Sequence, residues 1–118
     1  MNFEFDNSTP IYTQIIENIK ICIISGIFTP GEKLPSVREL ASQTKVNPNT
    51  MQKALTELEE TKLIYTERTT GKYVTTDKKL IDKVKKEYAK SITNKYYKDM
   101  KNIGLTKEEI YEYIKGEE

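Results

Sequence analysis

The sequence predicts a mainly α-helical chain with one small β-hairpin and a helical tail, and three observations support this fold class. Apolar residues recur at helical spacing in three segments before residue 62. Two runs rich in Thr, Tyr, Val and Ile then lie on either side of a three-residue break, as in a hairpin. From residue 78 onward Lys becomes frequent and the apolar residues thin to a narrow stripe. We therefore expect two domains, residues 1–76 and 77–118.

The first helix is expected to begin at Thr9-Pro10. Thr9 can cap the free backbone N–H groups, and Pro10 suits the first helical position, where its missing N–H costs nothing. Apolar residues follow at helical spacing: Ile11, Ile15, Ile16, Ile19, Cys22 and Ile23. Ser25-Gly26 is expected to end this helix. Residues 27–35 are then expected to form a loop with a turn at Pro30-Gly31.

Two short helices joined by a tight connector are predicted next. Ser36 and Glu39 form an S-x-x-E capping box, in which each side chain satisfies a free backbone donor. That helix is expected to end near Gln43, with Lys45-Val46 as the connector. Asn47-Pro48 again combines a cap with a proline, so the third helix should run to about Glu60. The inner faces are expected to hold Val37, Leu40 and Ala41 in the second helix, and Met51, Ala54, Leu55 and Leu58 in the third.

A β-hairpin is expected after the third helix. Its strands are predicted over Leu63–Arg68 and Lys72–Thr76, with Thr69-Thr70-Gly71 between them. Asp77 is expected to cap the helix that follows. Two helices joined by a tight connector have the spacing of a helix-turn-helix, and the hairpin would supply a wing.

The tail is predicted to hold a long helix and a short one. The long helix should begin at Lys78 and end at Gly104, and Thr106 with Glu109 forms a second capping box. The last helix should end at Gly116. The apolar stripe is expected to pack against a second copy of the chain; its residues are Leu80, Ile81, Val84, Tyr88, Ile92, Tyr96, Ile110, Tyr113 and Ile114.

Composition restricts the chemistry that this chain can perform. With no His there is no imidazole base and no zinc site of the usual His-containing kinds. The single cysteine, Cys22, is expected to be buried and inert, and it points to a reducing compartment. We expect no metal, no cofactor and no enzymatic activity. No apolar run reaches the ~18–20 residues that a bilayer requires. The acidic N-terminus lacks the basic region of a signal peptide, so a cytoplasmic location is expected.

Charge placement is more informative than net charge. Residues 1–76 carry 8 basic and 9 acidic residues, so bulk charge does not indicate a nucleic-acid partner. In a helix-turn-helix the second helix enters the major groove, and Asn or Gln can bind an adenine edge in two places. The first turn of that helix would present Asn47, Asn49, Thr50 and Gln52. The basic residues placed to contact DNA are Arg38, Lys45, Lys53, Arg68 and Lys72.

Several motifs in the expected order resemble a known family. Leu34-Pro35-Ser36-Val37-Arg38-Glu39-Leu40-Ala41 is similar to the L-P-S-x-R-x-L-A signature of GntR-family bacterial transcription factors. Pro10-Ile11-Tyr12, residues 46–59 and Gly71-Lys72-Tyr73-Val74 fit the same pattern, so the resemblance covers roughly residues 9–76. The short two-helix tail is similar to that of the YtrA subfamily, whose tails mainly dimerise and whose genes often accompany ABC transporters.

The resemblance implies roles at matching positions. Ser36 would touch a phosphate, Arg38 would contact DNA, and the wing around Thr70 and Gly71 would reach the minor groove or the backbone. Asn47, Asn49 and Thr50 would contact the operator. Three positions depart from the pattern: many relatives have Arg where Pro48 and Gln52 stand, and Thr69 replaces a frequent wing glycine. Base preference therefore cannot be carried over.

The function predicted from these observations is that of a homodimeric repressor. Two copies would bind a pseudo-palindromic double-stranded DNA operator with half-sites about 34–36 Å apart, and control of a transporter operon is one expectation. The alternative is a winged protein-interaction module, which the weak charge of residues 1–76 favours. No residue pattern marks a small-molecule effector site.

Three smaller alternatives stay open. Asn47 acts either as a cap alone or also as a base contact. The tyrosines of the tail are expected to be packing residues, with an aromatic ligand cage as the less favoured alternative. The lysines of the long helix form a solvated face or, less favoured, contact the flanks of the DNA; they are Lys78, Lys79, Lys83, Lys85, Lys86 and Lys90.

Overall fold

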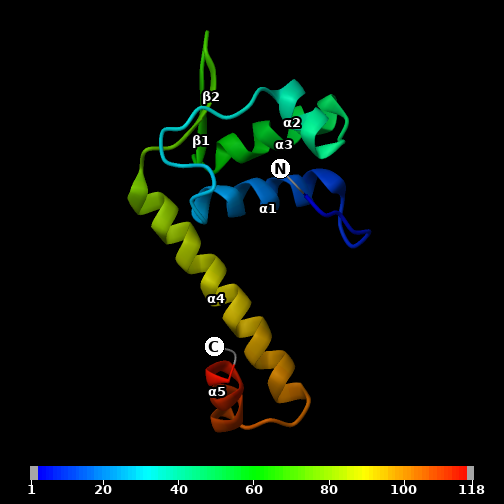
Figure 1. Ribbon diagram of the computed structural model, residues 1–118, viewed down its shortest axis with the longest axis vertical. Helices are drawn as coiled ribbons and strands as arrows, with labels where there is room; N and C mark the ends of the chain where they lie inside the picture. The colour runs from blue at the N-terminus through cyan, green and yellow to red at the C-terminus, as the bar shows by residue number, and fades with distance from the viewer. Residues whose placement is uncertain (1–2, 117–118) are drawn as a thin grey trace. The chain divides into compact units, whose positions relative to one another are not determined.

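The computed structural model describes residues 3–116 (Figure 1). Its elements in chain order are α1 (Ile11–Ile24), α2 (Val37–Thr44), α3 (Pro48–Glu60), β1 (Ile64–Glu67), β2 (Gly71–Val74), α4 (Lys78–Asn102) and α5 (Lys107–Lys115). The chain forms two compact units, the first extending to Asp82 and the second beginning at Lys83. The predicted fold class, mainly helical with one small hairpin, is confirmed. The hairpin projects beyond the three helices of the first unit, as a wing does (Figure 1).

Helix α1 begins one residue later than predicted. Pro10 is its N-cap, and no side chain caps the helix, so the prediction of a Thr9 cap was wrong. The reason lies in Gln14, whose amide Nε2 donates to the carbonyl oxygens of Asp6 (2.9 Å) and Thr9 (2.8 Å). The backbone N–H of Asp6 donates back to Gln14 Oε1 at 3.0 Å. Gln14 thus holds the preceding loop against the first turn of α1, while no side chain caps the free backbone N–H groups of that turn.

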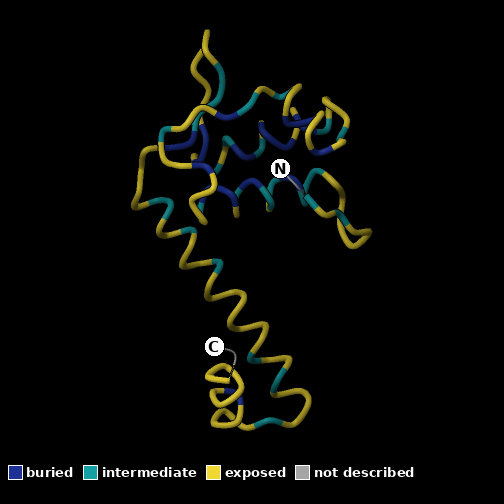
Figure 2. Tube along the Cα trace, in the orientation of Figure 1, coloured by how far each residue is buried: buried dark blue, intermediate teal, exposed yellow. Residues whose placement is uncertain are grey.

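The core of the first unit lies between α1, α3 and the hairpin (Figure 2). Ile15, Ile19 and Ile23 of α1 are buried. All four predicted inner residues of α3 are buried as well. Ile11, the first residue of the apolar spacing and of α1, is 48% exposed. Cys22 is buried as predicted, and burial raises the pKa of its thiol above the ordinary 9.0.

The segment that was predicted as a loop forms part of the wing. Gly31 has a φ of +80°, consistent with the predicted turn. Beyond the turn the chain pairs with the outer edge of β2: Leu34 N–H donates to the carbonyl of Lys72 (2.8 Å), and Gly31 N–H donates to that of Val74 (3.0 Å). These bonds satisfy backbone groups of β2 that would otherwise form a free sheet edge. They also place the start of α2 directly beside the wing.

The hairpin is shorter than the sequence predicted. The antiparallel register pairs Tyr65 with Tyr73, Thr66 with Lys72 and Glu67 with Gly71. Gly71 was expected in the break between the strands, but it lies in β2 with a φ of +124°, and the tip consists of residues 68–70. The rings of Tyr65 and Tyr73 stack with centroids 5.7 Å apart, which stiffens the outer face of the wing.

The second unit contains the later part of α4 together with α5. The predicted capping box at the start of α5 is present, with Thr106 Oγ1 accepting from Glu109 N–H at 3.2 Å. Ile110 of α5 is only 1% exposed. By contrast Ile92 is 65% exposed and Ile114 is 53% exposed, and no residue of α4 is buried. The predicted stripe thus lies largely uncovered by the described part of the chain.

The helices of residues 3–116 were also compared with the requirements of a membrane span. None of them combines the necessary length with a sufficiently apolar sequence.

Candidate nucleic-acid interface

The connector between α2 and α3 is tight because Lys45 adopts a left-handed conformation, with a φ of +58°. Its backbone N–H donates to Ser42 O at 3.3 Å, and Val46 N–H donates to Ala41 O at 2.9 Å. The chain therefore turns sharply after Thr44 and starts α3 soon after Lys45. Lys45 is exposed at this turn, as a residue that contacts DNA must be.

The first turn of α3 is polar and solvent-facing, as predicted. Asn47 caps the helix, its Oδ1 accepting from Asn49 N–H at 2.7 Å. This bond uses one lone pair of the amide oxygen, and the NH₂ group of Asn47 keeps both of its hydrogens available for a ligand. Asn49 is exposed and Thr50 is half-buried. Asn49 is thus the residue of this turn whose amide is free to bind a base edge in two places.

Gln52 and Lys53, one turn further along α3, make contacts within the protein. Gln52 Nε2 donates to Thr56 Oγ1 at 3.1 Å, along the helix and away from its N-terminus. The Lys53 ammonium lies 4.0 Å from the centroid of the Tyr12 ring, a cation–π contact between α3 and α1. Sequence reasoning missed Tyr12 as a partner, although it stands in the Pro10-Ile11-Tyr12 motif.

The start of α2 presents the residues of the signature motif. Ser36 Oγ accepts from Glu39 N–H at 3.1 Å, and Ser36 N–H donates to Glu39 Oε1 at 3.2 Å, so the predicted capping box is confirmed. The Ser36 hydroxyl keeps its own hydrogen available for an external acceptor. Arg38 is exposed, and within residues 3–116 it forms no ion pair. Its guanidinium is therefore free to bind an anion without first leaving a partner.

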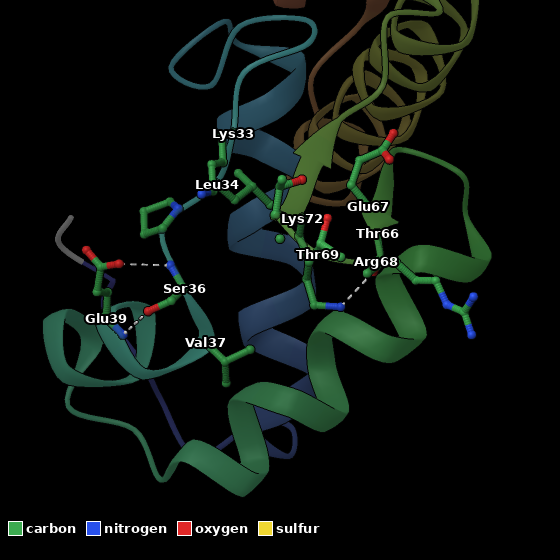
Figure 3. A pocket seen from close by; sticks show the side chains of 13 residues that line it. Lys33, Leu34, Ser36, Val37, Glu39, Thr66, Glu67, Arg68, Thr69 and Lys72 are labelled. Atoms are coloured by element: carbon green, nitrogen blue, oxygen red, sulfur yellow. Dashed lines mark hydrogen bonds between the residues drawn. The ribbon is translucent and has the colours of Figure 1, made fainter.

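A cleft of about 360 Å³ separates the start of α2 from the tip of the wing (Figure 3). It is lined by residues 33–37, Glu39 and residues 66–72. Arg68 and Thr70 belong to the tip, and the Arg68 side chain extends away from the strands (Figure 3). The structure thus brings Ser36 together with the predicted wing residues Arg68, Thr70 and Gly71.

Lys72 also lines this cleft, but its ammonium is bound within the protein. Lys72 Nζ lies 2.5 Å from Glu59 Oε1 and 3.0 Å from Thr66 Oγ1, and its side chain is only 17% exposed. The Thr66 hydroxyl also donates to Glu59. These three residues, here called the wing latch, join both strands of the hairpin to the last turn of α3.

The wing latch affects the titration of Glu59. The hydrogen bond from Lys72, followed by that from Thr66, lowers the pKa of the Glu59 carboxyl below its ordinary 4.5. The stabilisation that the latch contributes is therefore fully present above pH 4.5. It is lost as the pH falls through the lowered pKa and the carboxylate becomes protonated.

Lys33 is a basic residue of the cleft that sequence reasoning missed. It pairs with Tyr73 in an isolated antiparallel bridge and is exposed. Its position next to the wing depends on the pairing of residues 31–34 with β2, which no local sequence pattern indicated. The alternation of residues in that short segment is too brief to predict a strand.

Comparison with known proteins places the chain in a family. Residues 11–74 match the family described as bacterial regulatory proteins, gntR family. The chain is 41% identical to the HTH-type transcriptional regulator YhcF of Bacillus subtilis, over 98% of this chain and 95% of that protein. It is 39% identical to the HTH-type transcriptional repressor YtrA of Bacillus subtilis, over 92% of this chain and 85% of that protein.

Comparison with solved structures also finds members of the GntR family. A GntR family transcriptional regulator from Listeria monocytogenes superposes with a TM-score of 0.89 at 46% identity, over 97% of this chain and all of that one. The DNA-binding domain of AraR, solved in complex with operator ORX1, superposes with a TM-score of 0.57 at 30% identity, over 61% of this chain and 93% of that one. The resemblance seen in the sequence is confirmed, and the chain belongs to the GntR family of bacterial regulatory proteins.

Proposed function

We propose that this protein is a sequence-specific DNA-binding transcriptional regulator that acts as a repressor. The observation that carries the proposal is the exposure of Arg38 on α2, Asn49 at the start of α3 and Arg68 at the wing tip; within residues 3–116 the side chains of these residues have no partner. In a winged helix-turn-helix, α3 enters the major groove while α2 and the wing contact the backbone. The YtrA and AraR relatives support the repressor role and operator binding.

The first domain, residues 1–76, would bind DNA through the residues predicted from the sequence other than Lys72, whose ammonium is bound to Glu59. Ser36, Arg38 and Lys45 would hold the backbone on one side of α3, with Arg68, Thr70 and Gly71 on the other. Asn49 and Thr50 would contact the bases, with Asn47 contributing its NH₂ group. For Gln52 and Lys53 to reach DNA, each must exchange its contact with Thr56 or Tyr12 for one with the nucleic acid.

A salt titration tests DNA binding. Each phosphate contact releases condensed counterions, so the logarithm of affinity should fall linearly with the logarithm of salt concentration. If roughly six to ten phosphates are contacted, affinity should fall about 10³- to 10⁵-fold between about 50 and 200 mM salt. The measurement is fluorescence anisotropy with a labelled duplex that has been selected from a random pool. Failure to enrich any sequence, together with a flat salt response, would favour the protein-interaction alternative.

The second domain, residues 77–118, would join two copies of the chain. The support is the apolar stripe, of which Ile92, Tyr96, Tyr113 and Ile114 are exposed. A dimer would place two α3 helices on a pseudo-palindromic operator, and the doubled contact area supplies the affinity that one small module lacks.

Replacing Ile92 with Asp should dissociate the dimer. Ile92 is 65% exposed, so the change leaves the fold of the single chain intact while it places a charge in the proposed interface. Sedimentation equilibrium should show a monomer for Ile92→Asp and a dimer for the unaltered protein. The matched control is Ser91→Asp, which adds the same charge at the neighbouring exposed position, and it should remain dimeric. A dimeric Ile92→Asp variant would remove this stripe from the interface.

We also propose a cytoplasmic location and control of a transporter operon. Both rest on the likeness to the YtrA subfamily and on the expectation that a DNA-binding regulator works where the chromosome lies. Mapping the selected duplex sequence onto the genome of origin tests the operon assignment. A site that lies upstream of genes unrelated to transport would contradict it.

A further inference from the structure

Two lysines border the wing cleft in different surroundings. Lys72 lies on β2, and Lys33 lies on the segment that pairs with the outer edge of β2. Only Lys72 was expected to contact DNA from its place in the sequence. The two lysines differ in their ion pairing: Lys72 is bound to Glu59, whereas Lys33 forms no ion pair within residues 3–116.

Lys72 is held on the side of the wing that faces α3. Residues directly opposite in an antiparallel pair share a face, so Lys72 and Thr66 lie together, and Glu59 of α3 binds both. To reach a phosphate, the Lys72 ammonium would have to abandon a carboxylate at 2.5 Å and a hydroxyl at 3.0 Å. The largely buried position of its side chain adds the cost of breaking a shielded ion pair.

Lys33 is placed on the opposite face. It lies across from Tyr73, and therefore on the side of the wing that carries Tyr65 and Gly71. Gly71 gives its stem room, since a Cβ built on Gly71 would lie 3.2 Å from Lys33 Cε. The Lys33 stem thus passes close to the backbone of Gly71, and Lys33 lines the cleft.

The charges around Lys33 are mixed, because Arg68 adds a second cation to the cleft while Glu67 lies on the same face of the wing as Lys33. The acidic side chains that line the cleft are Glu39 and Glu67. Glu39 is engaged in the capping box, and Glu67 forms no ion pair among the described residues. Arg68 supplies a second cation at the wing tip. Lys33, Arg68 and the Ser36 hydroxyl thus line the same cleft, and each could bind a phosphate of the DNA backbone.

We propose that Lys33, together with Arg68, is the phosphate-contacting cation of the wing, and that Lys72 is a positioning residue that fixes the wing to α3. This inference rests on the DNA-binding function proposed above. Lys33 would neutralise a phosphate and thereby release condensed counterions from the DNA. The wing latch would fix the orientation of the wing.

The first test compares Lys33→Gln with Lys72→Gln in anisotropy titrations with a labelled duplex of random sequence, because phosphate contacts do not depend on sequence. Lys33→Gln should weaken binding about threefold and reduce the salt slope by about 0.9 for each phosphate that the variant no longer neutralises. Lys33→Arg should restore both the affinity and the slope. Lys72→Gln should leave the slope unchanged. Equal reductions of the slope in the two variants, or a reduction in Lys72→Gln alone, would overturn the inference.

The second test needs no DNA and examines the latch by thermal unfolding of Glu59→Gln, Lys72→Gln and the double variant. Because the two residues form one ion pair, the shift in Tm of the double variant should be smaller than the sum of the single shifts. Lys33→Gln should leave Tm unchanged. Additive shifts would show that the latch does not hold the wing and would overturn that half of the inference.

These tests separate the inference from the function on which it depends. If the unaltered protein binds no duplex at low salt, the proposed function fails, whatever the latch experiment shows. If it binds with a steep salt slope that Lys33→Gln leaves unaltered, the function stands and the role of Lys33 is refuted.

Discussion

Replacing Arg38 with Ala is expected to weaken operator binding about 10- to 100-fold, which corresponds to a loss of about 1–3 kcal/mol in binding free energy. Arg38 is exposed on α2 next to the capping box, and it has no ion-pair partner within residues 3–116. Because the Arg38 guanidinium breaks no ion pair within the protein when it binds DNA, the whole of its charge-assisted hydrogen bond contributes to affinity. Anisotropy with the selected duplex at fixed salt measures the change.

The controls for Arg38 distinguish charge, geometry and folding. Arg38→Lys keeps the charge but cannot donate two parallel hydrogen bonds. Its affinity for the duplex should therefore lie between that of Arg38→Ala and that of the unaltered protein. Lys115→Ala removes one charge from the exposed end of α5 and should leave affinity unchanged. The unfolding midpoint of Arg38→Ala should match that of the unaltered protein, since the side chain is exposed. Unchanged affinity would remove Arg38 from the interface.

The largest effect on stability is expected for Leu55→Ala. Leu55 is fully buried in α3, the helix that packs against both α1 and α2. Removing its side chain leaves a cavity in the middle of the core, which costs about 2–5 kcal/mol. Domains of this size have only about 5–15 kcal/mol of total stability. A large fraction of the free energy of unfolding should therefore disappear, and urea denaturation followed by circular dichroism measures it.

The matched control for Leu55→Ala is Glu60→Ala, at an exposed position of the same helix. A surface change of this kind should alter the free energy of unfolding by no more than about 0.5 kcal/mol. Both variants should be compared at one protein concentration, because the proposed dimerisation would make apparent stability depend on concentration. A loss of less than about 1 kcal/mol for Leu55→Ala would show that α3 is not the centre of the core.

Local signals in the sequence determined where most helices begin and which face of α3 is buried. The capping boxes at Ser36 and Thr106 were predictable because their hydrogen bonds join residues three apart, and chain geometry alone fixes such bonds. The apolar spacing of α3 depends in the same way on helical periodicity. The exposure of Asn49 agrees with that spacing, and the exposure of Arg38 agrees with the inner face predicted for α2, so much of the candidate interface was predictable too.

The start of α1 shows where local signals fail. Thr9 has the right chemistry for a cap, yet Gln14 forms the bonds that hold this end of the helix. The path of residues 6–9 leaves the helix without a side-chain cap and brings the backbone of Asp6 and Thr9 to Gln14. Preferences of single residues cannot predict this arrangement, because it depends on where the preceding loop lies.

Only the tertiary structure decided which basic side chains are free. Lys72 is bound by Glu59, thirteen residues earlier in the chain, and Lys53 lies over Tyr12 on a different helix. Lys33 borders the wing because residues 31–34 pair with β2. Each of these contacts joins segments that meet only when the helices and the hairpin pack together. Local sequence patterns predict hydrogen bonds between near neighbours, whereas the packing of the fold determines which residues distant in the chain become partners.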